Sequence, residues 1–169
     1  EDVEDVLGVP PLAEVPKLTG VDHEPFALVE RVVEAPDGML AEAIRALRVS
    51  LLIGRGQERA TTVMVASGED GDGKTTIAAS LARAAALSGD RVLLIDCDLD
   101  RPTVHTLFGG HDNVGIANVL LDKADSERAI QIDRASPALY LACGLTASGT
   151  KEIYRSLNWE DLLSLLSDH

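Results

Sequence analysis

Aromatic residues are scarce in this sequence, and no long apolar run interrupts it. Aromatic side chains make up 3% of the 169 residues, whereas hydrophobic residues as a class make up 46%. The core must therefore be built from Ala, Val, Leu and Ile, which suits helices packed on buried parallel strands better than a β-sandwich. No stretch approaches the eighteen or so apolar residues that a membrane-spanning helix requires. We expect one soluble domain with a layered α/β fold.

Clusters of basic residues are also missing. The chain has 28 Asp and Glu residues against 15 Lys and Arg residues, which gives a formal net charge of -13. Nucleic-acid binding draws much of its affinity from Lys and Arg contacts to phosphates, often beside aromatic side chains on which bases stack. Nucleic acid is therefore not expected as a partner.

Only two cysteines occur, Cys97 and Cys143. Both lie in apolar stretches, and neither has the spacing to further ligands that is typical of a metal site. No secretory leader precedes them, so we expect buried, reduced thiols in a cytosolic setting.

The composition of the chain changes near residue 36. Residues 1–36 contain Pro10, Pro11 and Pro16, which prevent regular helix, so this segment is expected to be a linker or edge element. The sequence begins without Met, and we expect a piece of a longer protein in which a membrane region precedes the segment.

Periodicity and turn residues predict regular structure beyond residue 36. The predicted helices span residues 37–54, 74–89, 102–109, 114–122 and 158–169, and the predicted strands span residues 61–67, 91–98 and 138–143.

A glycine-rich stretch joins the first predicted strand to the second predicted helix. Residues 68–75, GEDGDGKT, match the pattern G-x-x-x-x-G-K-[ST], in which backbone N–H groups and a helix N-terminus surround a phosphate. Gly71 and Gly73 are expected to adopt unusual backbone angles. Lys74 is expected to reach the β- and γ-phosphates of ATP or ADP, and the Thr75 hydroxyl to ligate Mg²⁺. The predicted nucleotide-binding residues are Gly71, Asp72, Gly73, Lys74, Thr75 and Thr76.

The alternative is a glycine-rich turn with an exposed lysine, which the flanking strand and helix make the weaker interpretation. Three acidic residues within the loop, Glu69, Asp70 and Asp72, are unexpected beside an anion. We expect their side chains to point outward, to repel stray anions or to address a partner.

A pair of carboxylates follows the second predicted strand. Asp96 and Asp98 lie two residues apart, so on an extended segment they point the same way and can both face a metal ion, directly or through water. Open α/β sheets collect their ligands at this end of the strands. The alternative is that either residue caps the helix beginning at Pro102. We assign catalytic roles to Lys74, Asp96 and Asp98, and metal binding to Thr75, Asp96 and Asp98.

These stretches together resemble the cytoplasmic ATPase domain of bacterial tyrosine kinases (BY-kinases), the polysaccharide co-polymerases of capsule and exopolysaccharide export, which are relatives of the MinD/ParA ATPases. The resemblance rests on residues 67–82 and 91–109, and it extends to an E-x-x-R-x-x-R motif and to residues 112–122. The motif consists of Glu42, Arg45 and Arg48.

The resemblance implies a P-loop NTPase-like, three-layer α/β domain with a mostly parallel central sheet, occupying residues 37–169 and incomplete at its C-terminus. It implies that Asp96 and Asp98 serve the metal and the acceptor hydroxyl. It also places Glu42, Arg45 and Arg48 at the subunit interface of a ring-shaped homo-oligomer that phosphorylates itself in trans. Without the family, this charged helix face would be ordinary solvated surface. The implied setting is the cytoplasmic face of the bacterial inner membrane, beside a membrane-embedded co-polymerase or adaptor segment.

The chain departs from the family pattern in three respects. Asp100 stands where the family usually has Arg, the strand carrying a third acidic motif is missing, and so is the tyrosine-rich tail, since only Tyr140 and Tyr154 occur. The sequence thus predicts an ATP-dependent tyrosine kinase domain that regulates polysaccharide chain length and export, with turnover by this chain left open. Two alternatives remain, a nucleotide-gated scaffold without catalysis and a MinD/ParA-type positioning ATPase, whose signature lysine is replaced by Glu69.

Overall fold

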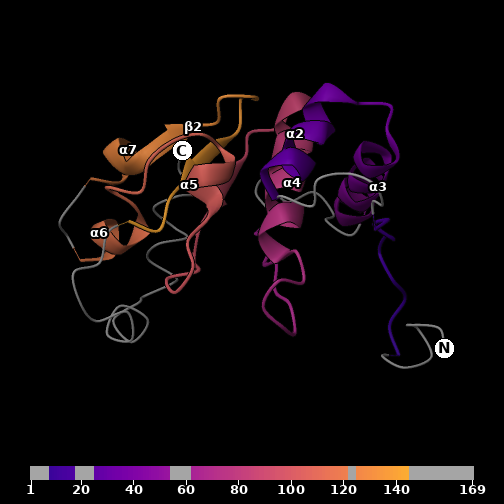
Figure 1. Ribbon diagram of the computed structural model, residues 1–169, viewed down its shortest axis with the longest axis horizontal. Helices are drawn as coiled ribbons and strands as arrows, with labels where there is room; N and C mark the ends of the chain where they lie inside the picture. Colours follow the sequence, from indigo (N-terminus) through magenta and orange to yellow (C-terminus); the bar gives the residue numbers. More distant parts are fainter. Residues whose placement is uncertain (1–7, 18–24, 54–61, 122–124, 145–169) are drawn as a thin grey trace. The chain divides into compact units, whose positions relative to one another are not determined.

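The computed structural model describes residues 8–17, 25–53, 62–121 and 125–144. Contacts divide the chain into two compact units, residues 1–90 and 91–169, which are described separately below (Figure 1). The predicted helix at 158–169 lies outside the described residues. Within those residues, no helix has the length and apolarity needed to cross a bilayer.

Among its described residues, the first unit contains the helices α2 (Pro25–Glu34), α3 (Met39–Ile53) and α4 (Lys74–Leu87). Both α2 and α3 pack against α4, as Figure 1 shows. A core cluster joins the three helices and consists of Val32, Leu40, Ile44 and Ala84, with Ile77 and Leu81 against it. Alanine has the highest helix propensity, which favours α4, and the helix ends before Gly89, whose φ of 92° is left-handed. The helices predicted at 37–54 and 74–89 are confirmed.

Helix α2 was not expected, because it lies within the segment interpreted as a linker or edge element. Pro25 occupies its first position, where the missing N–H costs nothing. Val29 and Val32 are buried on one face, three residues apart as helical packing requires. The proline-containing residues 8–17 form neither helix nor strand, and the Ser50 hydroxyl of α3 donates a hydrogen bond of 2.9 Å to the Leu12 carbonyl.

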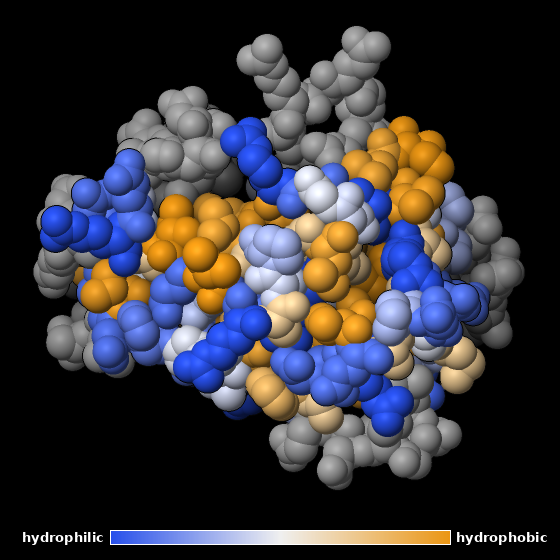
Figure 2. Space-filling view, turned by 90° about the horizontal axis from the view of Figure 1, so that it is seen from above, coloured by the Kyte–Doolittle hydropathy of each residue, from blue (hydrophilic) through white to orange (hydrophobic). Residues whose placement is uncertain are grey.

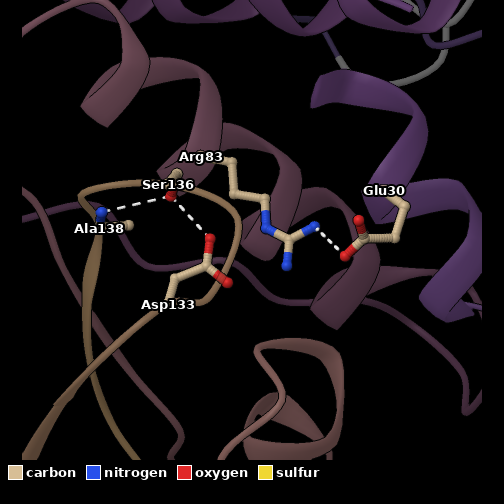
Figure 3. Close-up of polar contacts among 5 residues, drawn as sticks. All are labelled: Glu30, Arg83, Asp133, Ser136 and Ala138. Atoms are coloured by element: carbon tan, nitrogen blue, oxygen red, sulfur yellow. Dashed lines mark hydrogen bonds and ion pairs between the residues drawn. The ribbon is translucent and has the colours of Figure 1, made fainter. Parts of the chain in front are cut away.

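A buried ion pair holds α2 to α4 (Figure 3). The Arg83 guanidinium lies 2.8 Å from the Glu30 carboxylate, and the Arg83 side chain is 1% exposed. Because the Arg83 guanidinium is out of contact with water, its pairing with Glu30 compensates part of the cost of burying that charge.

The strand predicted at 61–67 is not formed in the described residues 62–67. Val63 and Met64 are 44% and 88% exposed. β-Branched residues favour an extended chain, but a strand also needs a neighbour to complete its hydrogen-bond ladder, and within the described residues none pairs with this segment. Figure 2 shows other apolar residues reaching the surface between polar ones.

The second unit contains a small sheet and short helices. Its elements are β1 (Leu93–Ile95), α5 (Val104–Leu107), α6 (Ile116–Leu120), α7 (Ser126–Ala129), β2 (Ile130–Ile132) and β3 (Leu139–Leu141). The strand order is β1-β3-β2, with β1 parallel and β2 antiparallel to β3. Its core cluster consists of Ile116, Ala129 and Leu141, with Leu93, Ile95, Val114, Val119 and Leu120 packed against it.

The α/β prediction is confirmed, as are strands within 91–98 and 138–143 and short helices within 102–109 and 114–122. The described sheet, however, is mixed rather than mostly parallel, because β2 was not predicted. A connection of only a few residues joins β2 to β3, and so short a connection requires antiparallel pairing. It is held by Ser136, whose hydroxyl donates to the Asp133 carboxylate at 2.7 Å and accepts from the Ala138 N–H at 3.2 Å (Figure 3).

Candidate functional site

The glycine-rich loop leads directly into the first turn of α4. Gly71 and Gly73 have φ values of 90° and 91°, as expected for glycines that turn successive amides in one direction. Gly73 is the N-cap residue, and no side chain caps this helix end. The N–H groups of a helix's first turn have no partner within the helix. The loop therefore has the backbone shape and the uncapped helix end that a phosphate group fits.

Lys74 and Thr75 occupy the first two positions of α4, so their side chains start beside this uncapped end. An ammonium and a hydroxyl in these positions are suited to the phosphates and the Mg²⁺ ion of a bound nucleotide, respectively. A Cβ atom added at Gly71 or Gly73 would meet no atom of the described residues within 4 Å. The glycines are thus required by their backbone angles, while the space above them remains open to a ligand.

The Asp72 carboxylate contacts the backbone of the loop. The Asp72 carboxylate accepts a hydrogen bond of 2.9 Å from the Glu69 N–H. The Ser67 hydroxyl donates a bond of 2.9 Å to the Glu69 carbonyl. Asp72 was predicted among the nucleotide-binding residues, and its side chain lies against the backbone at the start of the loop.

Asp96 follows β1 and is 4% exposed. One carboxylate oxygen accepts from the Asp98 N–H at 3.1 Å, and the other accepts from the Thr103 and Val104 N–H groups, each at 3.1 Å. Burial raises the pKa of Asp96, the hydrogen bonds from Val104, Asp98 and Thr103 oppose the rise, and the Asp98 charge adds to it. The capping role weighed as an alternative for Asp96 is therefore present in the structure.

This capping role restricts how Asp96 could also hold a metal ion. A carboxylate has about four acceptor positions, and three are used by backbone N–H groups. One Asp98 carboxylate oxygen accepts a hydrogen bond of 2.9 Å from the Arg101 N–H, and this contact is exposed. Within the described ranges, no group of three or more His, Cys, Asp or Glu side chains is arranged to hold a metal. The loop belongs to the first unit and the two aspartates to the second.

The charged face of α3 is not uniform. Arg48 pairs with Asp90 of the same chain, its Nη2 lying 2.8 Å and its Nε 2.9 Å from one carboxylate oxygen. Arg45 donates to the Pro36 carbonyl. Glu42 and Arg45 are exposed, whereas Arg48 is partly buried. Glu42 and Arg45 are thus more available to a second subunit than Arg48.

Sequence reasoning missed Asp90, the partner of Arg48. An acidic residue after a helix-ending glycine is common on protein surfaces, and 42 residues separate the two side chains. Charge patterning detects ion pairs three or four residues apart on one helix, so the sequence contained no signal for this pair.

The prediction that both cysteines are buried is correct for Cys143 and wrong for Cys97, which is exposed. Side chains alternate along an extended segment, so Cys97 points away from the side on which Asp96 is buried. Burial raises the pKa of Cys143 to about 12, and this thiol therefore remains protonated at neutral pH.

Comparisons with known proteins agree with these features. A sequence model of the CobQ/CobB/MinD/ParA nucleotide binding domain matches residues 63–160. Tyrosine-protein kinase YwqD of Bacillus subtilis is 41% identical over 96 residues, covering 57% of this chain and 40% of YwqD. Tyrosine-protein kinase etk of Escherichia coli is 28% identical over 137 residues, covering 81% of this chain and 19% of etk. This chain thus spans less than half the length of either kinase.

A solved structure, the kinase domain of Escherichia coli tyrosine kinase ETK, has the same fold. Its TM-score is 0.87 at 26% sequence identity, and the match covers 98% of this chain and 68% of that domain. The likeness confirms the predicted P-loop NTPase-like architecture.

Proposed function

We propose that this chain, which belongs to the CobQ/CobB/MinD/ParA nucleotide-binding domain family, is the ATP-binding part of a bacterial protein-tyrosine kinase. The observation that supports the proposal most is the loop in which left-handed Gly71 and Gly73 precede an uncapped helix beginning with Lys74. The relatives named above are tyrosine kinases, which favours phosphoryl transfer to tyrosine.

Each loop residue has a separate role in this proposal. The amides from Gly71 to Thr76 bind phosphate oxygens, and the Lys74 ammonium neutralises charge on the β- and γ-phosphates. The Thr75 hydroxyl and the Asp98 carboxylate would hold Mg²⁺, with Asp96 contributing through its remaining acceptor position or through water. When bound, Mg²⁺ stabilises the charge that develops on the transferred phosphoryl group. Asp98 also orients the acceptor hydroxyl.

We further propose that the protein acts in a polysaccharide export system at the cytoplasmic face of the bacterial inner membrane. Its partner there would be a membrane-embedded co-polymerase or adaptor segment. The family resemblance described above supports this placement, including the motif Glu42, Arg45 and Arg48 on α3.

The proposed ring uses the charged face of α3 as a subunit interface. Arg45→Ala is expected to weaken self-association of the protein at least roughly tenfold, because it removes an exposed charge available to a neighbour. Sedimentation velocity measures this. Asp90→Ala is the matched control, since it breaks the Arg48 pair and leaves Glu42 and Arg45 in place, so association should persist. Unchanged association in Arg45→Ala would refute the interface.

The kinase assignment is tested by incubating the protein with ATP and Mg²⁺ and probing for phosphotyrosine. We expect a signal in the wild type and a loss of roughly a hundredfold or more in Lys74→Ala, because a charge-assisted contact to the transferred group is removed. ATP hydrolysis without phosphotyrosine would support a positioning ATPase instead. Neither product would support a nucleotide-gated scaffold.

A further inference from the structure

The phosphate loop carries three carboxylates, Glu69, Asp70 and Asp72, directly before the lysine. Like charges repel, so each of them opposes the approach of a polyphosphate. If one of these carboxylates holds the loop in its binding shape through a specific contact, that contribution offsets the repulsion between its charge and the polyphosphate.

Such a contact exists at Asp72. This residue lies between the two left-handed glycines, Gly71 and Gly73, and its carboxylate reaches back to accept the Glu69 N–H at 2.9 Å. The carbonyl of Glu69 accepts the Ser67 hydroxyl at 2.9 Å. Both backbone polar groups of Glu69 are therefore held by side chains of the loop, one from each direction along the chain.

Packing does little to hold the middle of the loop. A Cβ at Gly71 or Gly73 would have no neighbour within 4 Å, and residues 66–72 are exposed. Glycine loses more conformational freedom on ordering than any other residue, so a loop with several glycines is costly to fix around a ligand. A hydrogen bond that closes residues 69–72 into a ring fixes part of the loop before the ligand arrives, and such preorganisation increases affinity.

We propose that Asp72 is a positioning residue of the phosphate loop, whose carboxylate holds the Glu69 amide and so fixes the loop in a shape ready to receive a nucleotide polyphosphate. This inference rests on the proposed function of the loop. The negative charge of Asp72 weakens nucleotide binding, whereas the hydrogen bond that its carboxylate oxygen accepts strengthens it.

Three variants of the 169-residue chain separate these effects. Asp72→Ala removes the charge and the acceptor, whereas Asp72→Asn removes the charge and keeps an acceptor oxygen. Glu69→Ala is the matched control: it removes one charge from the same loop, and its carboxylate makes no hydrogen bond or ion pair with any described residue. Dissociation constants for ADP are measured by isothermal titration calorimetry without Mg²⁺, which removes metal binding as an explanation.

We expect Asp72→Ala to bind ADP roughly fivefold more weakly than Glu69→Ala, the value of one exposed hydrogen bond. Asp72→Asn should lie within about twofold of Glu69→Ala because its oxygen restores the contact. Equal affinities for Asp72→Ala and Glu69→Ala would show that charge alone matters, and tightest binding by Asp72→Ala would show that the carboxylate obstructs the site. Either result overturns the proposal.

Amide hydrogen exchange of the empty protein gives an independent measurement. The Glu69 N–H should exchange several times faster in Asp72→Ala than in the wild type or in Glu69→Ala, because only that variant loses the acceptor. An unchanged exchange rate would contradict the proposal. A separate result would show that the proposed function itself is wrong. The wild type and Lys74→Ala would then bind ADP with equal affinity, whatever the Asp72 variants do.

Discussion

Gly144→Ala is expected to destabilise the second unit by about 2 to 5 kcal/mol, a large part of the stability of many domains. Gly144 has a φ of 88°, an angle that costs an alanine about 1 to 2 kcal/mol. A Cβ there would also lie 2.7 Å from the Gly115 nitrogen and 2.2 Å from the Asn118 side-chain oxygen. Overpacking of this kind costs roughly 1 to 3 kcal/mol more.

The close approach at Gly144 holds α6 against the end of β3. The Ile116 and Ala117 N–H groups donate to the Ala142 and Cys143 carbonyls at 2.8 and 2.9 Å. The Gly144 N–H donates to the Asp112 carboxylate at 2.6 Å. A side chain at Gly144 would separate these segments, so the loss of packing should spread to the sheet.

Urea denaturation followed by far-ultraviolet circular dichroism measures this effect. Gly71→Ala is the matched control, because Gly71 has nearly the same φ, 90°, but no atom within 4 Å of an added Cβ. Gly71→Ala should lower the free energy of unfolding only by the cost of a left-handed backbone angle for alanine, about 1 to 2 kcal/mol or less. If Gly144→Ala costs no more than Gly71→Ala, the described contact between Gly144 and Gly115 is wrong.

Asp96→Ala is expected to lower the free energy of unfolding by about 3 kcal/mol or more. The buried carboxylate accepts three backbone N–H groups, that of Val104 in a buried bond and those of Asp98 and Thr103 in partly buried ones. A buried donor left without an acceptor costs about 1 to 3 kcal/mol, and a partly buried one costs less. Asp98→Ala is the comparison, since its carboxylate accepts the exposed Arg101 N–H and caps no buried donor among the hydrogen bonds described above, and should cost about 1 kcal/mol. Equal destabilisation by the two variants would contradict the structural role of Asp96.

The pH dependence of stability follows from the raised pKa of Asp96. The folded protein retains the Asp96 proton to a higher pH than the unfolded chain does. The stability contributed by protonated Asp96 is therefore fully present at a pH below 3.8, the ordinary pKa of this carboxyl. This stability decreases as the pH rises through the pKa of Asp96 in the folded protein. The unfolding free energy of the wild type relative to Asp96→Asn, which does not titrate, should fall over that range. A rise would contradict the direction of the shift.

The destabilisation also affects how activity measurements are interpreted. A loss of kinase activity in Asp96→Ala would combine lost folding with any lost metal binding. Asp98→Ala tests the second acidic position with less damage to the fold, and comparing nucleotide binding of the two folded variants with and without Mg²⁺ separates the contributions.

The phosphate loop could be predicted from the sequence because its determinants are local. Eight consecutive residues contain the glycines, the lysine and the threonine, and the left-handed angles at Gly71 and Gly73 confirm the backbone expectation. Helices α3 and α4 were predictable for the same reason, since periodicity and a terminating glycine act within a few turns.

Features that depend on residues far apart in sequence were not predictable. The pairs Arg83 with Glu30 and Arg48 with Asp90 span 53 and 42 residues. The strand expected at 61–67 failed for a related reason: its composition favours extension, but strand formation depends on a partner that local sequence does not reveal. Cys97 is exposed because the neighbouring Asp96 side chain is buried on the opposite side of the extended segment. The apolar composition of this stretch does not indicate which side faces the interior.

Calorimetric titration of ADP into the wild type, Lys74→Ala and Lys17→Ala tests whether the loop before Lys74 binds a nucleotide polyphosphate. Lys17→Ala removes the same charge from the segment at residues 8–17 and should bind as the wild type does. Lys74→Ala should bind at least roughly thirtyfold more weakly, because a charge-assisted contact worth about 2 kcal/mol or more is lost. Equal binding by wild type and Lys74→Ala would contradict the assignment of the loop.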